Sequence, residues 1–154
     1  AIPFTIFEYT WKRGNYWAMV TMPPDRLAAT AIEPDYLAAI AAMERVGEAR
    51  AATVAYSTFL GRWPDNVAAS IGLANRHYAL GELREAETLL RQVFARHPDA
   101  VAVANNLAQI LSDLGRNEEA LELIDRAVQP DKSPFAASVR DTRAMILQRM
   151  GRDK

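Results

Sequence analysis

Residues 47–52 read GEARAA, residues 81–86 read GELREA and residues 115–120 read GRNEEA. The three stretches start 34 residues apart, and each has glycine in first place and alanine in sixth place. Self-similarity at a fixed period is the signature of repeat proteins, in which each unit packs only on its neighbours. A fourth glycine, Gly151, follows Gly115 after 36 residues. The sequence therefore predicts an array of similar units.

The residues around the middle copy follow the spacing of amphipathic helices, because apolar residues recur there at intervals of three and four. Gly81 is expected to end a first helix in the left-handed conformation, which is cheap only for glycine. Pro64 and Pro98 are expected to end second helices, since proline has no N–H to donate. Small residues are expected where two helices cross, at Ala52, Ala74, Ala86, Ala108 and Ala120.

A 34-residue helix–turn–helix unit with glycine, alanine and proline in these places resembles the tetratricopeptide repeat, or TPR. The resemblance covers roughly three quarters of the chain and implies a mainly α fold, an α-solenoid of stacked repeats. It implies three full repeats followed by a capping helix, at about 33–66, 67–100, 101–134 and 135–150.

The capping helix is expected to have one apolar and one basic side. Ala144, Leu147 and Met150 are expected to face the third repeat. The arginines are expected to form a solvated outer face or, alternatively, a docking site for an acidic partner; they are Arg140, Arg143, Arg149 and Arg152.

Residues 1–24 differ in composition from the repeats. Residues 4–11 and 16–22 are rich in aromatic and β-branched side chains and are separated by a turn signal, which predicts a short β-hairpin. The expected domains are therefore 1–24 and 25–154. Because an isolated hairpin is marginal in water, it must pack on the repeats, on a further domain, or on a second copy in a homodimer.

Several phrases also resemble one group of bacterial proteins, in which a papain-like domain of the double-glycine-peptidase type precedes C-terminal TPRs. The phrases are YWAMV at 16–20, RWP at 62–64, YALG at 78–81 and NNLA at 105–108. The resemblance implies that residues 1–24 are the last strands of such a domain and that this chain is an accessory region. The catalytic cysteine and histidine would lie upstream, so no catalytic residue is carried over.

The composition disfavours several classes of function. The chain has 154 residues, 50% of them hydrophobic, a net charge of −1, two histidines and no cysteine. It therefore offers no cysteine nucleophile or cysteine zinc site, and no catalytic, metal or cofactor site is expected. The near-neutral charge disfavours nucleic acid, and no run approaches the roughly 18 apolar residues of a membrane span. We expect a non-enzymatic bacterial scaffold in the cytoplasm or, if the peptidase-like resemblance holds, the periplasm.

The resemblance to TPR proteins implies a concave groove, lined by the first helix of each repeat, that binds a peptide or protein segment. The expected groove residues are Asn75, Tyr78, Asn105, Asn106, Gln109, Asp141 and Met145. Carboxamides can donate to and accept from a peptide backbone at once, so they can hold an extended ligand of any sequence. The plainer alternative is that these side chains solvate an exposed helix face. His77 is expected to pack between helices, and His97 to cap or solvate a turn.

Overall fold

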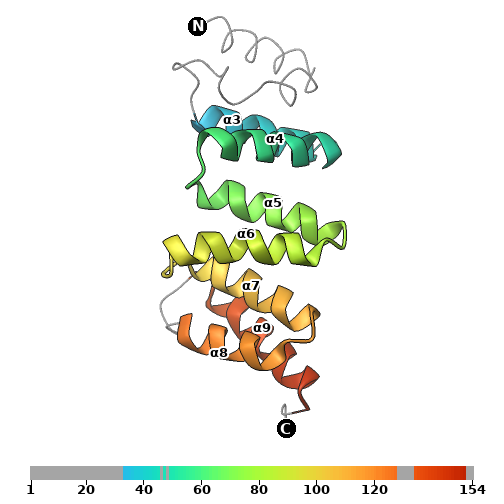
Figure 1. Cartoon of the computed structure of the whole chain (residues 1–154), viewed down its shortest axis with the longest axis vertical. Helices are drawn as coiled ribbons and strands as arrows, with labels where there is room; N and C mark the ends of the chain where they lie inside the picture. The colour runs from blue at the N-terminus through green and yellow to red at the C-terminus, as the bar shows by residue number, and fades with distance from the viewer. Residues whose placement is uncertain (1–32, 46, 48, 128–133, 152–154) are drawn as a thin grey trace, which may run out of the picture. The chain divides into compact units, whose positions relative to one another are not determined.

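The computed structural model describes residues 33–45, 47, 49–127 and 134–151, and within these residues it contains α-helices and no β-strand. The chain divides into two compact units, residues 1–76 and 77–154, with the division inside helix α5. The predicted hairpin at 1–24 lies outside the described residues. The helices are α3 (Glu33–Arg45), α4 (Ala49–Arg62), α5 (Val67–Ala79), α6 (Leu83–Arg96), α7 (Val101–Asp113), α8 (Asn117–Ala127) and α9 (Ala136–Arg149), as Figure 1 shows.

A left-handed glycine stands in each turn from a first helix to a second helix. The φ angle is 83° at Gly47, 77° at Gly81 and 82° at Gly115. At the last of these turns the Gly115 N–H donates to the Ser112 carbonyl at 2.9 Å, and the Arg116 N–H donates to the Leu111 carbonyl at 2.8 Å. These bonds satisfy carbonyls that the end of α7 would otherwise leave unpaired. The role predicted for Gly81 is confirmed.

The first unit has its core between α3, α4 and the start of α5. Ile40, Ala52 and Phe59 are fully buried, and Tyr56 is 8% exposed. The Tyr56 hydroxyl donates to the Glu44 carboxylate at 3.2 Å. Burial, followed by the nearby charge of Glu44, raises the pKa of Tyr56 to about 12, so the hydroxyl keeps its proton.

The second unit is built around α7, which packs against α6, α8 and α9. Ala104, Ala108 and Leu111 on α7 are fully buried, and so is Ala120 on α8. Burial of the small residues confirms the expectation for the crossing points, because only a small side chain lets two helix backbones approach closely. None of the helices in the described part of the chain is long and apolar enough to cross a membrane.

The expected orientation of the last helix is wrong. The buried residues of α9 are Val139, Thr142 and Ile146, whereas Ala144 is exposed. Spacings of three and four residues place these buried side chains on one face. Thr142 tolerates burial because its hydroxyl donates to the Ser138 carbonyl at 3.0 Å.

Two of the arginines expected to face water are exposed, as expected, but each also makes an ion pair. The Arg143 Nε lies 2.7 Å from the Asp125 carboxylate of α8. The Arg149 Nη1 lies 2.6 Å from the Asp113 carboxylate at the end of α7. Both pairs join α9 to the rest of the second unit, and they reduce the basic character expected of this helix.

Candidate functional site

One face of α7 carries a row of polar side chains. Asn105, Gln109 and Ser112 are spaced i, i+4 and i+7, so they share that face. Asn105 is 9% exposed, and its Oδ1 accepts no hydrogen bond from any residue that the structure describes. A buried acceptor without a donor costs roughly 1–3 kcal/mol, which a donor from a bound partner can recover.

A polar network continues from this row to the neighbouring helix ends. The Tyr78 hydroxyl, at the end of α5, donates to the Asp113 carboxylate. Arg149 donates through Nη1 to Asp113 at 2.6 Å and to the Ser112 hydroxyl at 2.9 Å. The Ser112 hydroxyl in turn donates to the Asn117 side chain at 2.6 Å. The network therefore fixes the directions of these side chains before any partner binds.

Tyr78 is the aromatic residue of this face. Its side chain is held by Asp113, while the residue stays 38% exposed. The hydrogen bond to Asp113, followed by burial, raises the pKa of Tyr78, against a smaller opposing effect of a hydrogen bond with Gln109. The hydroxyl therefore stays protonated, and the ring offers an apolar surface of fixed orientation.

The seven residues selected from the sequence do not all come together. Tyr78 hydrogen-bonds to Asp113 and to Gln109, and Asn105 lies on the same face of α7 as Gln109. On the outer part of α9, Asp141 is exposed and Met145 is half-buried; Asn106 is half-buried on α7. Asn75 is exposed on the part of α5 that belongs to the first unit.

Asp113 and Arg149 are not among the seven residues selected from the sequence, although they are central to the network. The sequence signal for the pair is their spacing. Asp113 and Arg149, the last residues of α7 and α9, are 36 residues apart, as are Gly115 and Gly151. Equivalent ends of neighbouring first helices lie close together in a stack of repeats.

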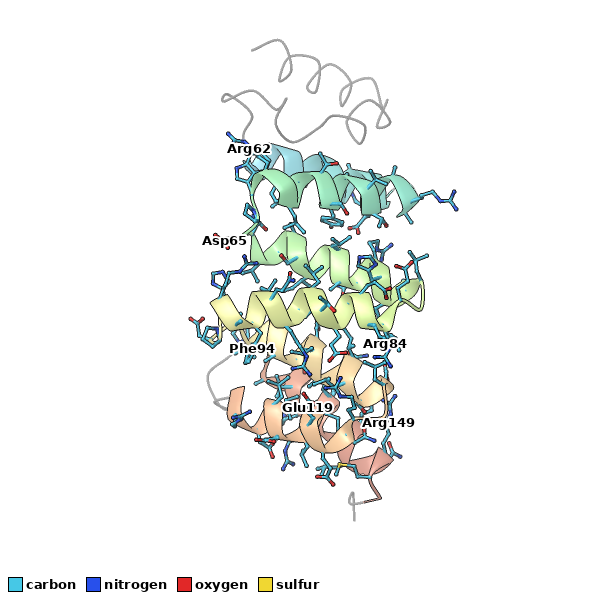
Figure 2. The ribbon with its side chains drawn as sticks, viewed as in Figure 1. Arg62, Asp65, Arg84, Phe94, Glu119 and Arg149 are labelled. Atoms are coloured by element: carbon cyan, nitrogen blue, oxygen red, sulfur yellow. The ribbon has the colours of Figure 1, made fainter. Side chains whose placement is uncertain are left out.

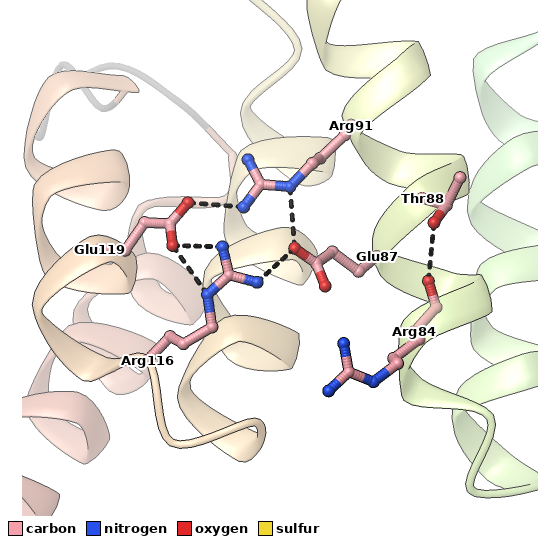
Figure 3. Close-up of polar contacts among 6 residues, drawn as sticks. All are labelled: Arg84, Glu87, Thr88, Arg91, Arg116 and Glu119. Atoms are coloured by element: carbon pink, nitrogen blue, oxygen red, sulfur yellow. Dashed lines mark hydrogen bonds and ion pairs between the residues drawn. The ribbon is translucent and has the colours of Figure 1, made fainter.

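A second cluster joins α6 to α8, and Figure 3 shows its contacts. The Glu87 Oε1 accepts hydrogen bonds from Arg91 Nε at 2.9 Å and from Arg116 Nη1 at 2.6 Å. The Glu119 carboxylate pairs with the same two arginines, at 2.5 Å in each case. Two positive and two negative groups thus neutralise one another, and the cluster offers no net charge to a partner.

The acid response of this cluster follows from the pKa values of its carboxyls. Burial acts to raise the pKa of Glu87, but the hydrogen bonds from Arg91 and Arg116 outweigh it, and the pKa falls below the ordinary value of 4.5. The bond from Arg91 likewise lowers the pKa of Glu119. Because both pKa values are lower in the folded state, the cluster stabilises the fold fully above pH 4.5 and loses its effect as the pH falls further.

We therefore expect the denaturant midpoint to drop as the pH falls from 4.5 to 3, and to drop less in Arg116→Gln than in the wild type. Circular dichroism at a series of pH values measures this. Arg84→Gln is the matched control, because Arg84 is an exposed arginine of α6 outside the cluster. Equal pH profiles for Arg116→Gln and the wild type would contradict the pKa argument.

A cavity of about 190 Å³ lies next to this cluster, between α6, α7 and α8, and its lining includes Phe94, Leu107 and Leu123. Figure 2 labels Phe94 on α6 and Glu119 on α8, two of the helices that bound it. Among the described residues, no three of the His, Asp and Glu side chains are grouped as ligands for a metal ion.

Comparison with known protein families finds the repeat directly. Two family models described as tetratricopeptide repeat match the chain, one over residues 33–99 and the other over residues 71–137. Together the two matches span residues 33–137 and cover helices α3 to α8. No curated protein matches the chain by sequence.

Comparison with solved structures finds MamA proteins. One from AMB-1 is 25% identical, with 94% of this chain and 85% of that chain covered and a TM-score of 0.65. MamA residues 41-end from Desulfovibrio magneticus RS-1 are 16% identical, with coverages of 97% and 84% and a TM-score of 0.67. At identities this low, the second likeness shows the fold alone. These matches do not support the resemblance to the peptidase-like proteins.

Proposed function

Because this chain is a tetratricopeptide-repeat protein, we propose that it is a non-catalytic interaction module, which binds an extended segment of a protein partner along the polar face of α7. The observation that carries the proposal is the buried Asn105 Oδ1, which accepts no hydrogen bond from the described residues. A backbone N–H of a bound segment would supply the missing donor.

The neighbouring groups extend this face in a way that suits a peptide backbone. Gln109 lies one turn after Asn105 and offers both a donor and an acceptor. Tyr78 follows at the end of the face with its hydroxyl held by Asp113, so its ring is available for apolar contact. Because an extended backbone alternates donors and acceptors, carboxamides one turn apart match it without regard to side-chain sequence.

The charges near the face point away from a ligand recognised by its terminal carboxylate. Arg149 is the cation of the network, and it already pairs with Asp113 at 2.6 Å. An incoming carboxylate would approach the negative charge of Asp113 together with the positive charge of Arg149, so the net attraction is small. We therefore propose recognition of an internal extended segment rather than a chain end.

Peptides selected from a displayed library of random 12-residue sequences test the proposal. We expect the double variant Asn105→Ala, Asn106→Ala to bind the selected peptides at least tenfold more weakly than the wild type, because it removes the unpaired acceptor of Asn105 together with the adjacent carboxamide of Asn106. Fluorescence anisotropy with a labelled selected peptide measures the affinity. The melting temperature is expected to stay within a few degrees of the wild-type value, since Oδ1 of Asn105 makes no bond to lose.

Gln92→Ala is the matched control, because Gln92 is an exposed carboxamide on α6, away from this face. Unchanged affinity of the double variant, or an equal loss in Gln92→Ala, would contradict the proposed face. Neither a role beside a peptidase domain nor a homodimer through residues 1–24 has a supporting observation among the described residues, and we propose neither.

A further inference from the structure

The end of α9 repeats the turn that elsewhere leads into a second helix. Gly151 has a φ angle of 69°, in the same left-handed region as Gly81 and Gly115. α9 ends two residues before Gly151, as α5 and α7 end two residues before their glycines. After Gly81 and Gly115 a second helix begins two residues further on. The backbone of α9 and its turn therefore have the form that accompanies a second helix.

The side chains of α9 also resemble those of a helix that is followed by a second helix. Residues 36 positions apart correspond on α7 and α9, and the corresponding pairs are Ala104 with Arg140, Ala108 with Ala144, and Leu111 with Leu147. The three residues on α7, which packs against α8, are fully buried. On α9 the first two are exposed and the third is half-buried. An alanine and a leucine thus recur at positions that are fully buried on α7, whereas on α9 no helix of the described residues buries them fully.

A hollow of about 520 Å³ adjoins the same end of α9. Its lining residues include Met150, which follows α9, Gly115 in the turn before α8, and Asn117, the first residue of α8. In the helix pair α7–α8, the turn at Gly115 leads directly into α8. By analogy, a second helix paired with α9 would begin beside Met150, where the hollow lies. The backbone turn, the uncovered face and the hollow together form a seat for one helix, which we call the α9 seat (Arg140, Ala144, Leu147 and Met150).

The charge of the α9 seat indicates what kind of helix it fits. Arg140 replaces the buried Ala104 of α7, is exposed, and has no ion pair with any residue that the structure describes. Arg143, on the neighbouring face, is 2.7 Å from Asp125 of α8, so α9 already pairs an arginine with an acidic second helix. A helix lying on the seat would meet a small residue at Ala144, an apolar one at Leu147 and a cation at Arg140.

We propose that the α9 seat binds an acidic amphipathic helix of a partner protein, which packs on α9 as α8 packs on α7. The partner helix carries a small residue opposite Ala144, so that the backbones approach closely, and acidic residues that reach Arg140. This surface is separate from the polar face of α7, and the proposal does not depend on the binding of an extended segment there.

The chain itself provides the probes. A peptide of residues 117–127 copies α8, which has four carboxylates, one arginine and the small residue Ala120. A peptide of residues 83–96 copies α6, which has the small residue Ala86 but three arginines and two glutamates. Each peptide is labelled and held helical by a staple on the side away from its alanine, because short helices are marginal in water. Fluorescence anisotropy with the full chain measures binding.

We expect the α8 peptide to bind at least fivefold more tightly than the α6 peptide. Arg140→Glu should weaken the α8 peptide at least fivefold by reversing the charge of the seat, and Ala144→Leu should do the same by holding the helices apart. Both residues are exposed, so the melting temperature should not change. Ala68→Leu, at an exposed alanine of α5, is the matched control and should leave the affinity unchanged.

Three results would overturn the proposal. Equal binding of the two peptides would remove the preference for an acidic helix. Affinity that Arg140→Glu and Ala144→Leu leave unchanged would place the peptide elsewhere, for example in the position of α8 itself. Sedimentation showing a wild-type dimer that Arg140→Glu dissociates would identify a second copy of the chain as the occupant. Asn105→Ala with Asn106→Ala should leave α8-peptide binding intact, and this separates the α9 seat from the face of α7.

Discussion

Replacing Phe59 by alanine is expected to lower the free energy of unfolding by about 3–5 kcal/mol. Phe59 lies on α4, is fully buried, and stands first by size among the fully buried side chains of the described residues. Its ring centroid is 4.7 Å from that of Trp63, which follows α4. The substitution removes apolar burial and leaves a cavity that the surrounding helices of this small core can fill only in part. Denaturant unfolding followed by circular dichroism measures the loss.

Val54→Ala is the matched control for this prediction. Val54 lies on the same helix but is 44% exposed, so its truncation is expected to change the free energy of unfolding by less than about 0.5 kcal/mol. If both substitutions have the same effect, α4 does not bury the face that contains Phe59. The comparison therefore tests the orientation of α4 and not only the presence of a helix.

Gly72→Val is expected to destabilise the chain by about 1–3 kcal/mol through overpacking. A Cβ atom built on Gly72 would lie 2.5 Å from Cζ and 2.7 Å from the hydroxyl oxygen of Tyr56. Tyr56 cannot move away freely, because it is 8% exposed and its hydroxyl donates to Glu44 at 3.2 Å. The better helix propensity of valine offsets only a few tenths of a kcal/mol of this cost.

Tyr56→Leu separates the steric cause from a general intolerance of substitution at Gly72. Leucine lacks the Cζ and hydroxyl atoms that a side chain at residue 72 would meet, so the double variant should lose less stability than the two single variants added together. Strict additivity, measured by the same denaturant titrations, would show that the close approach of Gly72 to Tyr56 does not set the cost.

The turns and helices were predictable because their signals are local. A glycine at a helix end and a proline two residues after a helix each act on their own neighbours in the chain, and their 34-residue period repeats the signal. The orientation of α9 was not predictable in the same way. Apolar residues lie all round this helix, with Val139, Ala144, Met145 and Leu147 on different sides, so its sequence does not single out one face.

The candidate site depends on contacts that no local pattern contains. The spacing of Asn105 and Gln109 was enough to place them on one face of the helix. It did not predict the burial that leaves Oδ1 of Asn105 without a donor. The sequence predicted that Arg149 is solvated and has no partner within the chain. Its ion pair with Asp113 forms only because α9 packs beside α7. A residue whose partner lies 36 positions away is assigned correctly only when the packing of its helix is known.

The left-handed glycines also provide equivalent points at which the chain can be cut and rejoined. Gly47, Gly81 and Gly115 hold the backbone at φ angles between 77° and 83°, so the exit from each first helix has nearly the same local geometry. A cut at one of these glycines can be rejoined at another without a new turn having to be designed. Duplication or deletion of 34 residues between two such points exchanges whole helix pairs, and the binding surfaces that they carry move with them.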